Sequence, residues 1–144
     1  MPQRPPPQSV TVLAAVLAFN LVSTTIHYTH NFLMADDYPP VPFFPNSLAY
    51  QVGIAVFYPL LTVLGLWGFA RYRAGKMRYV STAFVAYAML GFSSIGHFVG
   101  GVPEVPPFFL ATISTDFGGG LSLLVFAALI VSRSLTPVDR PSMV

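Results

Sequence analysis

The segment 5–35, PPPQSVTVLAAVLAFNLVSTTIHYTHNFLMA, contains no Asp, Glu, Lys or Arg. A helix that crosses the hydrocarbon core of a bilayer needs about 20 mostly apolar residues, and this segment provides them. Three further segments repeat the pattern: Asp37 to Arg71, Arg78 to Glu104, and Glu104 to Arg133, the last interrupted only by Asp116. We therefore predict four membrane-spanning helices, near 10–34, 47–70, 79–101 and 107–132.

The whole chain shares this apolar character. Of its 144 residues, 54% are hydrophobic and 8% are charged, and the mean hydropathy is +0.66. An ordinary soluble domain has about 25% charged residues. The absence of cysteine excludes disulfides, thiolate metal sites and iron–sulfur clusters, and a net charge of +2 gives no basic surface for nucleic acid. We expect an all-α, polytopic membrane protein whose surroundings are the lipid bilayer.

Proline placement supports the same division of the chain. Proline lacks the amide hydrogen that a helix interior requires, and only Pro59 of the 14 prolines falls in the interior of a predicted span, since Pro107 is the first residue of the last one. The remaining length allows only tails and short connections. We expect an N-terminal tail at 1–9, a single domain at 10–133 folded as a four-helix up-down bundle, and a C-terminal tail at 134–144.

The charged residues indicate the orientation of the four spans. With four spans, both tails and the second loop share one side, and this side contains every basic residue of the chain: Arg4, Arg71, Arg73, Lys76, Arg78, Arg133 and Arg140. The opposite loops carry Asp36, Asp37 and Glu104. Cytoplasmic loops carry the excess of Lys and Arg. We therefore expect both termini in the cytoplasm and the protein in the plasma (inner) membrane.

Polar side chains gather in the outer half of the predicted spans. Asn20, Thr24, His27 and Asn31 follow spacings of four, three and four, so they share one helix face. The other members of this group are His30, Gln51, Ser94, His97, Thr112 and Asp116. An ionisable group inside a bilayer costs about 2.5–3.5 kcal/mol on insertion scales. We therefore expect the group to face the bundle interior, with a histidine as the partner of Asp116.

These residue types suggest a metal or haem site. Imidazole nitrogen suits zinc, copper and iron, so His27, His30, His97 and Asp116 are candidate metal ligands. Haem b bound by two histidines needs imidazoles that face each other at one depth, and His97 with His27 or His30 meets that requirement on paper. A metal- or haem-binding membrane redox protein is one functional hypothesis.

Two other hypotheses fit the same residues. His27 and His30 are also typical of histidines that contact head groups, His97 of an interhelical hydrogen bond, and Asp116 of a cap on a broken helix start. In that case the chain is an accessory or structural subunit that assembles with other membrane subunits or as a homo-oligomer, which is the function the sequence favours. A small proton-coupled transporter is the third hypothesis. No catalytic motif identifies an enzyme.

Overall fold

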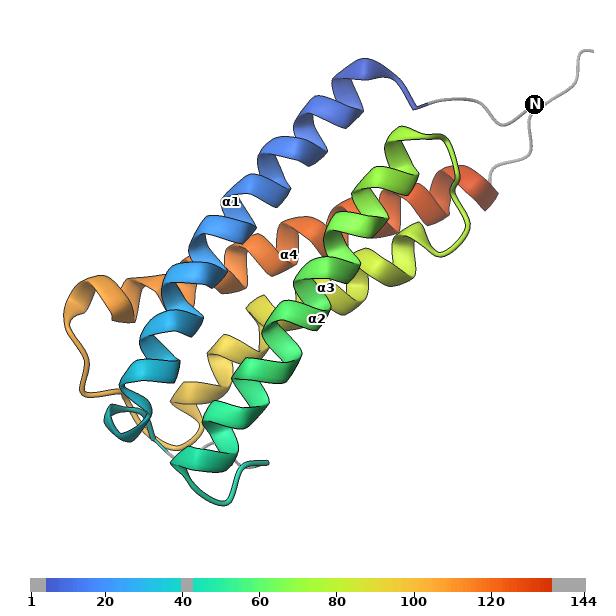
Figure 1. The fold of residues 1–144 in the computed structure, drawn as a ribbon. Coiled ribbons are helices and arrows are strands. Elements are labelled where there is room, and N and C mark those ends of the chain that lie inside the picture. The colour runs from blue at the N-terminus through green and yellow to red at the C-terminus, as the bar shows by residue number, and fades with distance from the viewer. Residues whose placement is uncertain (1–4, 40–42, 136–144) are drawn as a thin grey trace, which may run out of the picture.

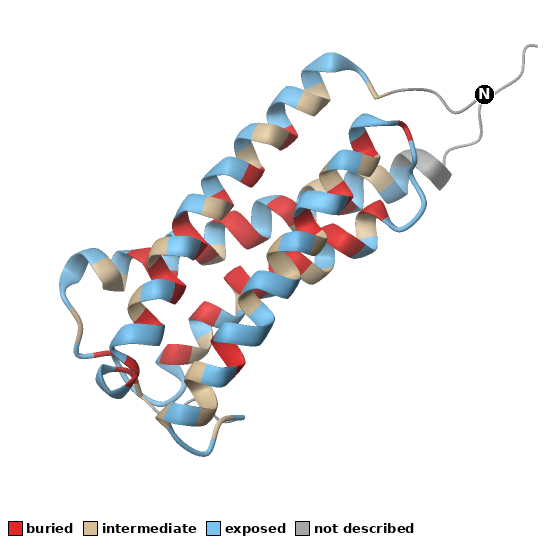
Figure 2. Cartoon of the chain, in the orientation of Figure 1, coloured by how far each residue is buried: buried red, intermediate tan, exposed pale blue. Residues whose placement is uncertain are grey.

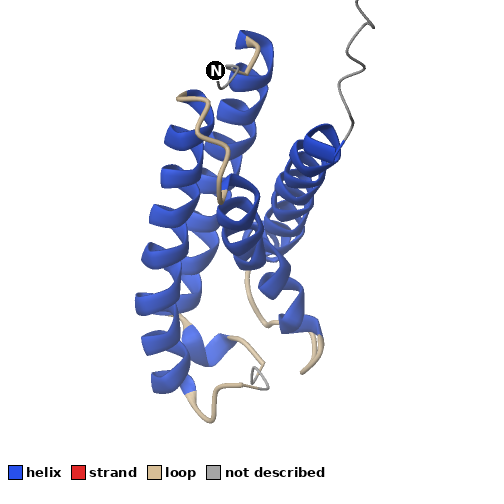
Figure 3. Ribbon diagram, turned by 90° about the vertical axis from the view of Figure 1, so that its right-hand side faces the viewer, coloured by secondary structure: helices blue, strands red, loops and turns tan. Residues whose placement is uncertain are grey.

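The computed structural model describes residues 5–39 and 43–135, and all regular structure within them is helical (Figure 3). Arg4, Arg140 and most of the two expected tails lie outside the described residues. The elements, in chain order, are α1 (Pro7–Leu33), the short 3-10 helix η1 (Ala35–Asp37), α2 (Ser47–Arg73), α3 (Val80–Ser94), the 3-10 helix η2 (Ile95–Phe98) and α4 (Pro107–Leu135). Four helices therefore occupy the four apolar segments of the sequence.

Local sequence signals explain where these helices begin and end. α1 starts at Pro7 and α4 at Pro107, and proline suits a first turn because no backbone N–H is needed there. Asn46 caps α2, since its Oδ1 accepts the Ala49 N–H at 2.9 Å. Gly75, with a φ of 69°, follows the end of α2 in the left-handed conformation that glycine adopts easily.

Three of the helices, α1, α2 and α4, are long and apolar enough to cross a membrane. The fourth expected span, 79–101, forms an α-helix of only 15 residues, α3, which is continued by the four residues of η2. At 1.5 Å per residue, α3 is about 22 Å long, which is shorter than the hydrocarbon core. Glycine weakens a helix, and Gly96 lies where α3 has given way to η2.

The helices pack as a ring in which each contacts two main neighbours. α3 packs against α4 and α2, and α1 packs against α4 and α2, whereas α1 and α3 hardly touch. Figure 1 shows the loop after α1 and the loop before α4 at one end, and the α2–α3 turn at the other. A hydrogen bond from the Glu104 N–H to the Asp37 carbonyl, 3.3 Å long, joins the two loops. Acidic and basic residues therefore lie at opposite ends.

The interior divides along the bundle into an apolar and a polar half. Near the basic α2–α3 turn, Leu13, Phe84 and Leu123 are fully buried, and Figure 2 shows buried residues on the facing sides of the helices. Toward the acidic loops, apolar residues such as Ile113 are buried together with nine polar ones: Asn20, Ser23, Thr24, His27, Asn31, Ser94, His97, Thr112 and Asp116. The polar face expected on the first helix is therefore buried in the structure.

α3 and α4 approach each other closely beside Asp116, at Gly91 and Gly120. A Cβ on Gly91 would lie 2.2 Å from the Asp116 carbonyl oxygen, and one on Gly120 would lie 2.8 Å from the Ala88 carbonyl oxygen. Both distances are too short for any side chain, so the two backbones touch at these glycines, as in other membrane helix pairs with small residues. Gly118, by contrast, faces open space.

Candidate functional site

The antiparallel register of α1 and α4 sets the polar pairs of the interior. Successive contacts along the two helices, about one helical turn apart, define this register: His27 with Thr112, Ser23 with Asp116, and Asn20 with Gly119. Each turn toward the start of α1 is matched by a turn toward the end of α4. This register decides which histidine or serine meets each polar residue of α4.

The hydrogen bonds of His27 assign its tautomer. The Thr112 hydroxyl donates to the Phe109 carbonyl at 2.6 Å, so its oxygen is left to accept from Nδ1 of His27 at 2.9 Å. Nε2 of His27 is then an acceptor, and Nδ2 of Asn31 donates to it at 3.0 Å. His27 is therefore a neutral imidazole whose Nε2 lone pair points at Asn31.

His97 and Tyr50 complete a histidine cluster, which we define as His27, Asn31, Tyr50 and His97. Nε2 of His97 lies 3.0 Å from the same Asn31 nitrogen, and the Tyr50 hydroxyl oxygen lies 2.8 Å from it. Because the Nε2 atoms of His27 and His97 both lie 3.0 Å from this nitrogen, the distance between them is at most twice 3.0 Å. The centroids of the two rings are 5.4 Å apart. One amide nitrogen with two hydrogens therefore contacts three polar atoms.

Two atoms of the histidine cluster are buried without a hydrogen-bond partner in the described part of the chain. They are Oδ1 of Asn31 and Nδ1 of His97, and these residues are 0% and 4% exposed. Leaving a buried donor or acceptor unpaired costs about 1–3 kcal/mol. Buried polar atoms in proteins are usually paired, and Thr62, Arg71 and Tyr87 each have one further atom of this kind in the described residues.

His30 lies apart from this cluster. Its Nδ1 is 2.7 Å from the Tyr38 hydroxyl, and its ring stacks on Phe109 with centroids 3.6 Å apart. Burial raises the pKa of Tyr38 to about 12, and the nearby Asp37 adds to the rise. Tyr38 therefore keeps its proton at physiological pH and can donate it to His30. This pair ties the end of α1 to the loop that follows.

Asp116 does not pair with a histidine, although the sequence led us to expect one. It is fully buried, and its carboxyl group accepts from the hydroxyls of Ser23 and Ser94, the latter at 3.2 Å. The reason is the α1–α4 register, because Asp116 lies one turn deeper than Thr112, the partner of His27. The carboxyl group is therefore held by neutral hydroxyls.

The remaining predicted lining residues bond to the backbone. Asn20 donates to the Gly119 carbonyl at 3.2 Å, and Thr24 donates to the Asn20 carbonyl within α1 at 2.7 Å. Gln51, which is half-buried, donates to the Phe32 carbonyl at 2.8 Å and so joins α2 to α1. Asn20 and Gln51 therefore join two helices and Thr24 bonds within its own helix, and none of the three belongs to the histidine cluster.

The geometry does not support a haem between His27 and His97. A haem bound by both would place its macrocycle between the two imidazoles, and the Asn31 amide occupies that space. Among the described residues, no three His, Asp or Glu side chains come together in a group that could hold a metal ion. The structure therefore does not show the zinc, copper or iron site that was predicted for His27, His30, His97 and Asp116.

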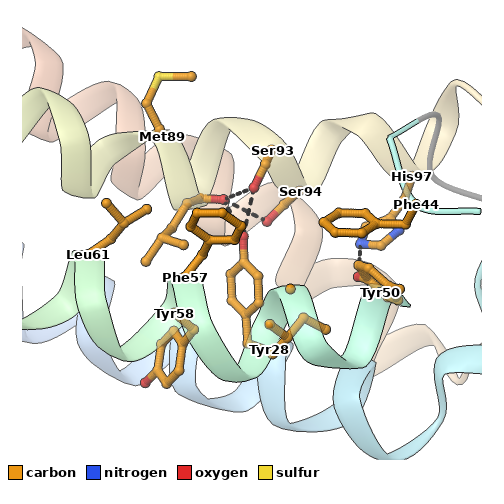
Figure 4. Close-up of a pocket in the computed structure, with 13 residues that line it drawn as sticks. Tyr28, Phe44, Tyr50, Phe57, Tyr58, Leu61, Met89, Ser93, Ser94 and His97 are labelled. Atoms are coloured by element: carbon orange, nitrogen blue, oxygen red, sulfur yellow. Dashed lines mark hydrogen bonds between the residues drawn. The ribbon is translucent and has the colours of Figure 1, made fainter. Parts of the chain in front are cut away.

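A cavity of about 270 Å³ lies beside the histidine cluster, between α2 and α3 (Figure 4). His97 and Tyr50 stand at one end of it with Phe44, and Phe57, Leu61 and Met89 extend along it. The other lining residues are Tyr28, Gly53, Ile54, Tyr58, Leu90, Ser93 and Ser94. The cavity is thus mainly apolar and aromatic, with polar groups at one end and on the α3 wall.

Sequence reasoning missed the tyrosines of this site. The Tyr28 hydroxyl donates to the Leu90 carbonyl at 2.8 Å, and the Tyr50 hydroxyl contacts Asn31 and His97. Both tyrosines lie inside long apolar segments, where a hydroxyl must find a protein partner. A tyrosine inside an apolar segment therefore indicates, from the sequence alone, a side chain that faces another helix.

We predict that Asn31→Leu lowers the free energy of unfolding of the purified protein in detergent by at least about 1–3 kcal/mol, because it removes the donor in contact with three polar atoms. Gln51→Leu, which removes one bond at a half-buried position, should cost less than about 1.5 kcal/mol. Unfolding followed by helical circular dichroism measures both. Equal losses would show that the shared amide has no special role.

No protein-family model, curated protein or solved structure matches this chain. Its function is therefore inferred from the contacts and the cavity described above, since a helical fold alone supports many functions.

Proposed function

We propose that this chain is a small membrane protein that binds a lipophilic molecule in the cavity between α2 and α3. The observation that carries the proposal is the cavity itself, which is lined by apolar and aromatic side chains and bordered at one end by His97 and Tyr50. Small-molecule sites in proteins have this composition, with a few polar groups that orient the ligand, and they begin at about 300 Å³.

The size of the cavity argues against a simple packing defect. Protein interiors contain few voids larger than a water molecule, and a water occupies about 30 Å³ of liquid. A cavity of about 270 Å³ is several times larger. The cavity is mainly apolar and opens at the outer surface beside Phe57 and Met89, which are about half exposed, so the bilayer around the helices is the natural source of an apolar occupant.

We further propose four membrane spans, with both termini in the cytoplasm at the plasma (inner) membrane. Three helices have the required length and hydropathy, and α3 extended by η2 is proposed as the fourth. Support comes from the charges: Asp36, Asp37 and Glu104 belong to the two loops that meet at one end, and the α2–α3 turn at the other end contains only basic charges.

Ligand binding explains more of the structure than the other hypotheses do. An accessory or structural subunit accounts for the packed helices but gives the cavity and the unpaired atoms of Asn31 and His97 no role. A proton-coupled transporter needs polar groups along a path across the membrane, whereas the buried residues near the basic turn, such as Leu13 and Phe84, are apolar. A haem-based redox role needs two imidazoles on opposite sides of a macrocycle, and the Asn31 amide lies between His27 and His97.

We predict that a photoreactive long-chain alcohol carrying a diazirine labels the α3 residues that line the cavity, Met89, Leu90, Ser93 and Ser94, in the purified protein, and that excess unlabelled alcohol suppresses this labelling. Leu61→Trp fills the cavity and should reduce the labelling to the level of the outer helix surfaces. Leu60→Trp is the matched control, because Leu60 is exposed and does not line the cavity. Peptide mass spectrometry measures the sites. Unchanged labelling in Leu61→Trp would contradict the proposed function.

The orientation has its own test, because the chain contains no cysteine. We expect a cysteine at position 104, in Glu104→Cys, to react with a membrane-impermeant maleimide added to intact cells. A cysteine at position 76, in Lys76→Cys, should react only after the cells are permeabilised. The reverse pattern would place the basic turn outside, and equal reaction at both positions would contradict the four-span topology.

A further inference from the structure

We propose that the ligand of the α2–α3 cavity is neutral and that its polar end carries a hydrogen-bond acceptor, as in the ring carbonyl of a quinone with a lipid tail. This inference rests on the proposed function and names the ligand class for the same site. Three observations carry it: the absence of charge in the cavity lining, the direction of the hydrogen bonds at its polar end, and the aromatic character of its walls.

The lining of the cavity excludes a charged head group. None of the thirteen residues that line it is Asp, Glu, Lys or Arg. Asp116 is separated from the cavity by Ser94, which lines it and donates to the carboxyl group. An unpaired charge is very costly in an apolar environment. Fatty-acid carboxylates, phospholipid head groups and alkylammonium ions would therefore lack a counter-charge at this site.

The hydrogen bonds at the polar end call for an acceptor on the ligand. The Tyr50 oxygen accepts from Nδ2 of Asn31 at 2.8 Å, so the hydroxyl hydrogen of Tyr50 is free to be donated. The acceptor that it faces is Nε2 of His97, at 3.3 Å (Figure 4). This distance is longer than the usual ranges between oxygen and oxygen, about 2.5–3.0 Å, and between nitrogen and oxygen, about 2.7–3.2 Å. A carbonyl oxygen that enters this end of the cavity can take the same hydrogen at a normal distance.

The shape and surroundings of the cavity favour a flat ring with a tail. Aromatic rings of Phe44, Phe57 and Tyr58 are among its walls, and aromatic side chains pack well against a planar ring. A volume of about 270 Å³ accommodates a ring but not a long chain. Phe57 and Met89 are both lining residues and about half exposed, so the cavity borders the outer surface, where a lipid tail can continue into the bilayer.

The test uses the purified full chain in detergent and measures how well three probes displace the photoreactive alcohol from α3. The probes are decylubiquinone, which is neutral and carries ring carbonyls, the anion oleate and the cation decylammonium. Decylubiquinone should displace the label at the lowest concentration. Tyr50→Phe should weaken its binding about threefold to tenfold, the effect of losing one hydrogen bond. Tyr72→Phe is the control, because that hydroxyl bonds to Ser9, outside the cavity lining.

The outcomes separate the two proposals. Stronger displacement by oleate or decylammonium would overturn the ligand class and leave the cavity as a binding site. Unchanged labelling in Leu61→Trp would overturn the binding site itself. Helical circular dichroism checks that Tyr50→Phe folds. If it does not, infrared spectroscopy of decylubiquinone bound to the unmodified protein decides: a lowered carbonyl stretching frequency relative to empty micelles supports the hydrogen bond, and an unshifted frequency overturns it.

Discussion

The side-chain amide of Asn31 is the interaction on which the polar half of this bundle depends. It faces Nε2 of His27 on its own helix, Nε2 of His97 after α3 and the hydroxyl of Tyr50 on α2. Thr112 on α4 holds the other side of the His27 ring. The Asn31 amide nitrogen therefore connects side chains of α1, α2 and η2 directly, and one of α4 through His27. Asn31 and His27 are fully buried and His97 nearly so, so the positions of the helices and the orientations of the two imidazoles depend on each other.

The division of the interior gives this arrangement its functional meaning. Toward the basic turn, the core is apolar and closely packed around residues such as Phe84. Toward the acidic loops, polar side chains are concentrated, two of their atoms remain unpaired, and a cavity opens beside them. A polar network in a low-dielectric interior is costly unless it is fully paired. Recognition of a ligand provides a reason for keeping such a network at one depth in a small bundle.

The distribution of charge predicted where the four helical segments lie, because long stretches without Asp, Glu, Lys or Arg coincide with the helices. The shared depth of His27 and His97 likewise predicted that they could meet. The predicted length of the third helix was wrong, because the apolar sequence continues past Ser94 whereas the α-helix ends there. The histidine partner predicted for Asp116 was also wrong. The true partners depend on the register of α1 against α4, which the spacing of residues within one helix does not determine. The cavity depends on how α2 and α3 pack, and no local pattern encodes it.

The central claim is that a lipophilic molecule occupies one defined site beside the histidine cluster, and methionine methyl groups test it most directly. Met89 lines the cavity, whereas Met34 and Met77 are exposed elsewhere and do not line it. In nuclear magnetic resonance spectra of the protein with 13C-labelled methionine methyls, added decylubiquinone should shift the Met89 signal to saturation while those of Met34 and Met77 stay in place. Parallel, non-saturating shifts of all three signals would show that the molecule only partitions into the micelle, and would contradict the account.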